Sequence, residues 1–259
     1  MEWNSKGRLC YYARLLVPIK MNKTMIATYI LIFQMLFAAC VAPQKCVKGN
    51  GEVEERTLEL AEFNSFMVGC SADVELKQGD VQRVIIVGES NILDMFNKDV
   101  ENGMWRIVTD KCYQTKKGLK VMITVKDLER IKINGSGDVR SKGLIKTKDF
   151  IIDINGSGDV SMELDTEDLK TSINGSGDLL ISGECYSMDI NVNGSGDIDA
   201  SELNTGDCDI EVNGSGDSQV NVTGHLRVNI NGSGDVHYLG HPKSLEVDEN
   251  GSGDVRDAN

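Results

Sequence analysis

Seven aspartates recur at regular distances in the second half of the chain, each ending the same motif, Asn-Gly-Ser-Gly-Asp. The copies begin at Asn134, Asn155, Asn174, Asn193, Asn213, Asn231 and Asn250 and end at Asp138, Asp159, Asp178, Asp197, Asp217, Asp235 and Asp254. Their oxygens could bind calcium, but calcium takes about six to eight oxygen ligands and one copy supplies a single carboxylate with a few weaker donors. The calcium repeat of secreted β-rolls also has a shorter period. We therefore predict no cofactor and no metal site, with at most weak calcium binding along the aspartates.

Catalysis is the second chemistry to consider, because glycan-active enzymes with a β-helix fold use acid pairs and arginine in a cleft. Here the acids are the repeat itself, and Arg140, Arg227 and Arg256 are scattered through it. His237 and Tyr238, just after a motif copy, are the one further candidate for a site. No GxSxG, P-loop or HExxH motif occurs in the sequence. We predict a protein that is not an enzyme and has no catalytic residues.

The spacing of the motif indicates the architecture that positions these side chains. Successive copies are 21, 19, 19, 20, 18 and 19 residues apart. A near-constant period of this length is typical of a solenoid, in which each repeat packs only on its neighbours. We expect one coil per copy, with coils stacked about 4.8 Å apart.

The residues beside the motif alternate in polarity as a half-buried strand does. Apolar residues precede the asparagine directly in six copies (Ile133, Ile154, Ile173, Val192, Val212 and Ile230), and apolar residues follow the aspartate in all copies but one, which has Ser218. Cys208 falls on a core position and is expected to be a small buried hydrophobe. The pattern predicts an all-β solenoid of about 19 residues per coil, with a continuous core of Ile, Val and Leu.

The motif itself is expected to form a corner between two strands. Asn-Gly is favoured where a positive φ is needed, and glycine reaches backbone angles closed to other residues. Ser and Asp side chains can bond nearby backbone N–H groups. In the last copy Glu249 replaces the usual Ile or Val, which suits a polar end cap that blocks further strand pairing.

The region before the repeat is less regular but also rich in β pattern. We divide the chain into an irregular β-rich section over residues 49–128 and the repeat solenoid over residues 129–259. The segment Gly69–Val74 looks like a degraded corner, and residues 91–97 could form one short helix. We expect this section to pack on the solenoid without a linker.

The N-terminus has the pattern of an export signal. Residues 25–39 are apolar and uncharged, and Lys20 and Lys23 precede them, so residues 1–39 are predicted to be a signal peptide. A start at Met21 would have more usual proportions, so residues 1–20 could be a misassigned start. The segment ends in Leu-Phe-Ala-Ala-Cys40 and resembles the lipobox of bacterial lipoproteins, which implies lipidation of Cys40 and a tether over residues 40–48. Ordinary cleavage after Ala42 is the alternative.

The net charge and the cysteines argue against three features: a nucleic-acid ligand, a disulfide framework and a zinc site. The formal net charge is −13 and no basic run follows Lys48, which argues against a nucleic-acid ligand. Five cysteines remain after Cys10 and Cys40 are set aside, at irregular spacing and in odd number, so no disulfide framework is predicted. No CxxC or Cys/His pair occurs, so no zinc site is expected either.

Residues 49–80 (GNGEVEERTLELAEFNSFMVGCSADVELKQGD) and 120–139 (KVMITVKDLERIKINGSGDV) resemble the head GIN domain family, which is described as putative auto-transporter adhesins. The resemblance extends over about residues 49–259. It implies a single-stranded, right-handed β-helix-like fold and a place on the bacterial cell envelope.

We interpret the chain as a lipid-anchored, non-enzymatic envelope protein, with the membrane contacted through the lipid alone. The leading function is adhesion or ligand binding through polar faces of the solenoid. Its partner would be a glycan, a protein of the envelope or of a host, or a second copy of the solenoid. A periplasmic scaffold is the alternative, and a glycan-active enzyme is the third hypothesis. The sequence predicts an outer-membrane lipoprotein and leaves open whether it faces the periplasm or the exterior.

Overall fold

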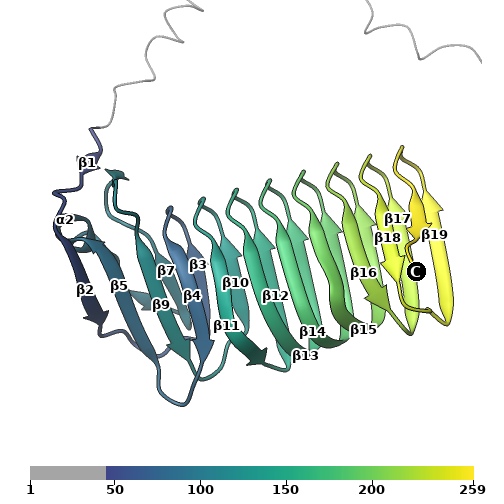
Figure 1. Cartoon of the computed structure of the whole chain (residues 1–259), viewed down its shortest axis with the longest axis horizontal. Coiled ribbons are helices and arrows are strands. Elements are labelled where there is room, and N and C mark those ends of the chain that lie inside the picture. Colours follow the sequence, from purple (N-terminus) through teal and green to yellow (C-terminus); the bar gives the residue numbers. More distant parts are fainter. Residues whose placement is uncertain (1–44) are drawn as a thin grey trace, which may run out of the picture. The chain divides into compact units, whose positions relative to one another are not determined.

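The computed structural model describes residues 45–259, so the predicted signal peptide and Cys40 lie outside the described residues. The described part is a parallel β-solenoid of about seven turns with about 19 residues per turn (Figure 1). Its strands are β1 (Val47–Lys48), β2 (Val53–Leu58), β3 (Ser65–Val68), β4 (Asp73–Gln78), β5 (Arg83–Glu89), β6 (Val100–Glu101), β7 (Met104–Ile107), β8 (Tyr113–Gln114), β9 (Lys120–Val125), β10 (Arg130–Ile133), β11 (Val139–Lys146), β12 (Asp149–Ile154), β13 (Val160–Ile173), β14 (Leu179–Val192), β15 (Ile198–Val212), β16 (Ser218–Val222), β17 (His225–Ile230), β18 (Val236–Leu239), β19 (Ser244–Glu249) and β20 (Val255–Asp257), with one short helix, α2 (Ser90–Leu93). No helix among residues 45–259 is long and apolar enough to cross a membrane.

Each coil has two extended halves that the motif separates. The strands after a motif form the post-corner face, which contains β11, the first halves of β13 to β15, β16, β18 and β20. The strands before a motif form the pre-corner face, which contains β10, β12, the second halves of β13 to β15, β17 and β19. Neighbouring strands within each face are parallel. On the pre-corner face they are in register, so equivalent residues of successive coils lie side by side, whereas the register shifts within three pairs of the post-corner face. The corners form a row of loops along one edge (Figure 1).

The core lies between the two faces and is continuous along the solenoid. The residues directly before the motif, from Ile133 to Ile230, have no exposed surface, and burying each such side chain stabilises the fold by about 1.5–3 kcal/mol. Cys208 is 3% exposed, which confirms its assignment to the core, and burial raises the pKa of its thiol. The expected alternation and continuous core are therefore confirmed.

The section before the repeat continues both faces of the solenoid, but its strands are not stacked in the order in which they occur in the sequence. Strand β3 pairs with β10, and β4 pairs with β11, so the coil of β3 and β4 stacks directly on the first repeat coil. Strands β7 and β9 form the next coil outward, although they come later in the chain. Antiparallel β5 and β2 extend the post-corner face beyond β9.

Two local expectations for this section can be compared with the structure. Asn134 N donates to Val68 O (2.8 Å) and Gly137 N to Cys70 O (3.2 Å), which confirms that the segment after β3 is a degraded corner. The helix is shorter and earlier than predicted, at Ser90–Leu93 instead of residues 91–97. It ends there because Phe96 is buried and forms a β-bridge with Thr109.

The segment that enters the solenoid is tied to the corner between β7 and β9. Cys46 and Cys112 form a disulfide, and β1 pairs in parallel with β8. The sequence predicted no disulfide framework, and this single disulfide was missed, because its pairing depends on a contact between segments 66 residues apart and not on regular spacing. Cys70, Cys185 and Cys208 are free within the described part of the chain.

Glu89 reinforces the same tie from the end of β5. It is 3% exposed, its carboxylate accepts a hydrogen bond from Gly51 N (2.7 Å), and Thr115 Oγ1 donates to its other oxygen. The hydrogen bond from Thr115, helped by the N–H groups of Gly51 and Lys116, lowers the pKa of Glu89. The carboxylate therefore links the entry segment to the corner that carries Cys112.

We expect Glu89→Gln to lower the Tm at neutral pH, because the amide has one acceptor oxygen in place of two and loses the charge that strengthens the bonds from Gly51 and Thr115. A lowered folded pKa means that the ionised group stabilises the fold above the ordinary Glu pKa of about 4.3. This contribution is lost as the pH falls through the folded pKa. The difference in Tm between wild type and variant should therefore shrink in acid. Thermal melts from neutral to strongly acidic pH test this, with exposed Glu55→Gln as control; a difference independent of pH would contradict it.

The C-terminal end carries a polar cap at Glu249. In earlier coils the N–H after the motif donates to the next aspartate carbonyl, as Val236 N does to Asp254 O (2.9 Å). The coil of Val255 is the outermost of the described coils, and its N–H donates instead to Glu249 Oε1 (3.1 Å). The glutamate thus supplies an acceptor that the next coil supplies elsewhere, and its role in blocking further strand pairing stays a prediction.

Candidate functional site

The motif asparagines form a ladder along the row of corners. Asn155 Nδ2 donates to Asn134 Oδ1 at 3.2 Å, and the same bond joins each later pair up to Asn231 at 3.1 Å. Asn250 leaves the ladder and donates to Asp248 Oδ1 (3.0 Å). The amides are exposed, but five of the seven carboxamide oxygens are used in stacking one coil on the next.

The motif aspartates form a second ladder beside the first. Each carboxylate from Asp138 to Asp235 accepts a hydrogen bond from the backbone N–H of the aspartate in the following coil, at 2.8 to 3.1 Å. The expected contact between aspartate and a backbone N–H is confirmed, but it joins neighbouring coils instead of closing a local turn. The carboxylates therefore act first as parts of the stack.

The role expected for the motif glycines was wrong. None of them has a φ in the left-handed region; the glycines that do, such as Gly143 and Gly183, lie outside the motif. A Cβ on Gly194 would lie 2.0 Å from the carbonyl oxygen of Gly175 in the preceding coil, and the other motif glycines meet their neighbours similarly. Glycine is required at these two positions of the motif because a Cβ there would collide with the backbone of the preceding corner.

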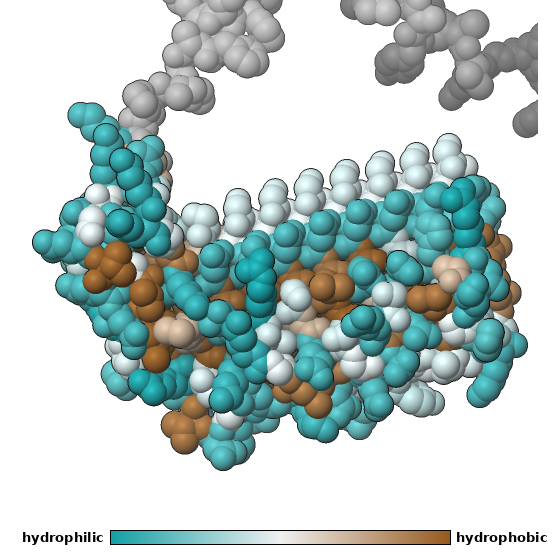
Figure 2. Space-filling model, viewed as in Figure 1, coloured by the Kyte–Doolittle hydropathy of each residue, from teal (hydrophilic) through white to brown (hydrophobic). Residues whose placement is uncertain are grey.

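The motif serines are the motif side chains that stacking does not use. All seven are exposed, and none of their hydroxyls makes a hydrogen bond within residues 45–259. The corners form a continuous row of projections along one edge of the surface (Figure 2). One free hydroxyl per coil therefore stands on this edge, at the repeat distance of the solenoid.

The structure gives little support to a strong cation site. Residues 45–259 contain no group of three or more His, Cys, Asp or Glu side chains that could hold a metal ion. Weak calcium binding along the aspartates stays a prediction, and a Tm that rises when calcium is added after chelation would support it.

We expect Asp197→Ala to lower the free energy of unfolding by about 1 kcal/mol, because the N–H of Asp217 loses its acceptor. Asp197→Asn should cost less, since an amide oxygen can still accept the bond. The matched control is Asp254→Ala in the outermost described coil, where no backbone N–H of a following coil depends on the carboxylate and an exposed ion pair with Arg256, which contributes little, is lost instead. Urea unfolding of the three variants measures this, and an equal loss for Asp197→Ala and Asp254→Ala would contradict it.

His237 and Tyr238 do not form a site together. They are neighbours on β18, so their side chains point to opposite faces of the strand, and Tyr238 packs against the core.

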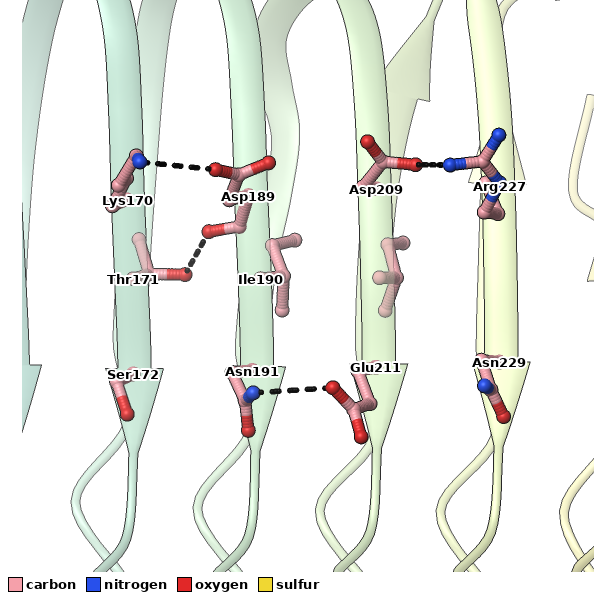
Figure 3. A pocket seen from close by; sticks show the side chains of 11 residues that line it. Lys170, Thr171, Ser172, Asp189, Ile190, Asn191, Asp209, Glu211, Arg227 and Asn229 are labelled. Carbon is pink, nitrogen blue, oxygen red and sulfur yellow. Dashed lines mark hydrogen bonds and ion pairs between the residues drawn. The ribbon is translucent and has the colours of Figure 1, made fainter.

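A groove that the sequence analysis missed crosses four strands of the pre-corner face (Figure 3). It has a volume of about 500 Å³. One wall consists of Lys170, Asp189, Asp209 and Arg227, and the other of Ser172, Asn191, Glu211 and Asn229. Each wall takes one residue from β13, β14, β15 and β17, because these residues are register partners. The buried residues Thr171, Ile190 and Ile210 form the floor.

The charges in the groove alternate along one wall from basic through acidic to basic. Lys170 Nζ lies 3.7 Å from Asp189, and Arg227 lies 3.3 Å from Asp209. Asp189 and Asp209 are direct neighbours on adjacent strands, an arrangement that is unfavourable for two like charges. On the other wall Asn191 Nδ2 donates to Glu211 (3.4 Å), and the buried oxygen of the Asn229 side chain has no partner. The alternation of outward residues could have pointed to this groove only once the coil register was known.

The profile of a protein family described as "putative auto-transporter adhesin, head GIN domain" matches residues 62–242. No curated protein matches the chain.

Several solved structures have the same fold. A putative adhesin from Bacteroides fragilis is 23% identical, with a TM-score of 0.78 over 82% of this chain and 99% of that one. A putative lipid binding protein from Parabacteroides distasonis is 24% identical, with a TM-score of 0.63 over 82% and 100%. A putative adhesin from Parabacteroides merdae is 22% identical, with a TM-score of 0.62 over 81% and 98%. At these identities the likeness establishes the fold.

Proposed function

Because the chain belongs to the head GIN domain family of putative auto-transporter adhesins, we propose that it is a non-enzymatic adhesin or ligand-binding protein of the bacterial envelope. The observation that carries this proposal is the row of corners that repeats coil by coil along one edge, with one exposed serine hydroxyl in each corner (Figure 2). A repeating surface is suited to a partner that also repeats, such as a glycan.

Export and anchoring are part of the same proposal. The signal pattern of residues 25–39 and the lipobox at Cys40 support a lipoprotein. The disulfide between Cys46 and Cys112 supports an oxidising compartment, because cytosolic thiols are kept reduced. The tether would then enter the solenoid through the tied segment around Cys46.

A periplasmic scaffold is the second candidate, and one observation favours it. Asparagine and aspartate side chains of the motif are used to stack coils, so much of the repeat is explained without an outside ligand. A scaffold needs a stable, regular rod and no exposure at the cell surface.

Protease shaving of intact cells separates the two functions. An adhesin should be cleaved while a periplasmic control protein survives, and Cys40→Ser should release it from the membrane fraction. Protection equal to that of the control would reject the adhesin in favour of the scaffold.

A further inference from the structure

We infer that the groove on the pre-corner face, lined by the walls from Lys170 to Arg227 and from Ser172 to Asn229, binds an extended neutral glycan along the solenoid axis. The inference rests on the proposed function and names the site and the ligand class for it.

The shape of the groove requires a ligand with a translational repeat. Each of four successive coils contributes one residue to each wall. Three steps of about 4.8 Å between neighbouring strands separate the outer strands by about 14 Å. One step is comparable to the length of a sugar residue in an extended glycan. A linear oligosaccharide could therefore offer similar groups to each coil in turn.

The chemistry of the walls suits hydroxyl groups. Carboxylates accept from sugar hydroxyls, amides both donate and accept, and the guanidinium of Arg227 donates. Asp189 and Asp209 are each about half exposed, so both have oxygen lone pairs that the flanking Lys170 and Arg227 do not occupy. Sugar hydroxyls placed between these two carboxylates would donate to both and offset their mutual repulsion.

Other polymers fit the groove less well. Three acids at its centre (Asp189, Asp209 and Glu211) and a net charge of −13 oppose an anionic glycan or a nucleic acid. A peptide strand cannot add to the floor by β-augmentation, because β14 and β15 are paired on both sides and leave no free edge. No aromatic side chain lines the groove, so binding would come from hydrogen bonds and be weak for each site.

The test is titration of the full chain with neutral β-linked glucose oligomers of two to six units, followed by NMR or calorimetry. Affinity should rise with length and level off at about three or four sugars, the span of the groove. The variant Asp189→Asn/Asp209→Asn should bind the hexamer about tenfold more weakly. The matched control Asp165→Asn removes an exposed, ion-paired acid on the post-corner face and should stay within about twofold of wild type.

Three results would overturn the inference: no binding of any neutral oligomer, equal affinity in the double variant, or preference for a sulfated glycan or a peptide. The variants replace exposed side chains, so we expect the Tm to stay unchanged. Weaker binding at an unchanged Tm would then come from the lost carboxylates in the groove and not from partial unfolding. Failure here is distinct from failure of the proposed function. A protein that is cleaved on intact cells but binds no oligomer remains an adhesin with another site, whereas a protected protein is not an adhesin whatever its groove binds.

Discussion

Replacing Gly194 with alanine is expected to lower the free energy of unfolding by about 3 kcal/mol. The new Cβ would lie 2.0 Å from the Gly175 carbonyl oxygen, which is backbone and cannot move aside as a flexible side chain would. The coil of Gly194 is also held from its other side by the coil of Gly214, so it cannot shift away without disturbing a second interface. Chemical denaturation of the variant measures the loss.

Gly251→Ala is the matched control for this prediction. It has the same place in the motif and the same 2.0 Å approach, to the carbonyl oxygen of Gly232. Its coil is the outermost of the described coils, so it can relax outward, and its cost should be well below that of Gly194→Ala. Equal losses at the two positions would mean that stacking between coils does not explain the glycines.

Removal of the disulfide by Cys46→Ser/Cys112→Ser should lower the free energy of unfolding by about 4 kcal/mol. The chain-entropy treatment gives this value for a closed loop of 66 residues. Wild-type protein treated with a reductant should lose a similar amount, and the same reductant should leave the double variant unchanged. Unfolding curves with and without reductant test this; a variant as stable as wild type would show that the hydrogen bonds of β1 and Glu89 are sufficient alone.

The coils of the repeat and the residues of the core could be predicted because both depend on patterns of residues that are close together in the sequence. The period of the motif predicted one coil per copy. The alternation of apolar and polar residues around Ile154 or Val192 predicted a strand and which of its faces is buried. The polar cap at Glu249 was predictable as a departure from the same pattern.

What could not be predicted depends on contacts between coils or on the order of strands in space. The motif glycines were assigned to positive φ because an isolated turn has no neighbour, whereas the structure places Gly175 O against Gly194. The coil of β3 and β4 lies between segments that follow it in the chain, which no local pattern records. The groove needs the register of β13, β14, β15 and β17. Cys46 meets Cys112 only because β1 pairs with β8, which are far apart in the sequence.

The link between Cys46 and Cys112 also decides how the solenoid responds to tension. A pull on the chain before Cys46 passes through the disulfide to Cys112, so the segment between them, with β2, β5 and α2, carries no tension. These antiparallel strands at the end of the fold would otherwise be the first to peel away. With the link broken, tension would act on this segment, and its complete unfolding would add 66 residues, roughly 220 Å of extended chain, between the pulled end and Cys112.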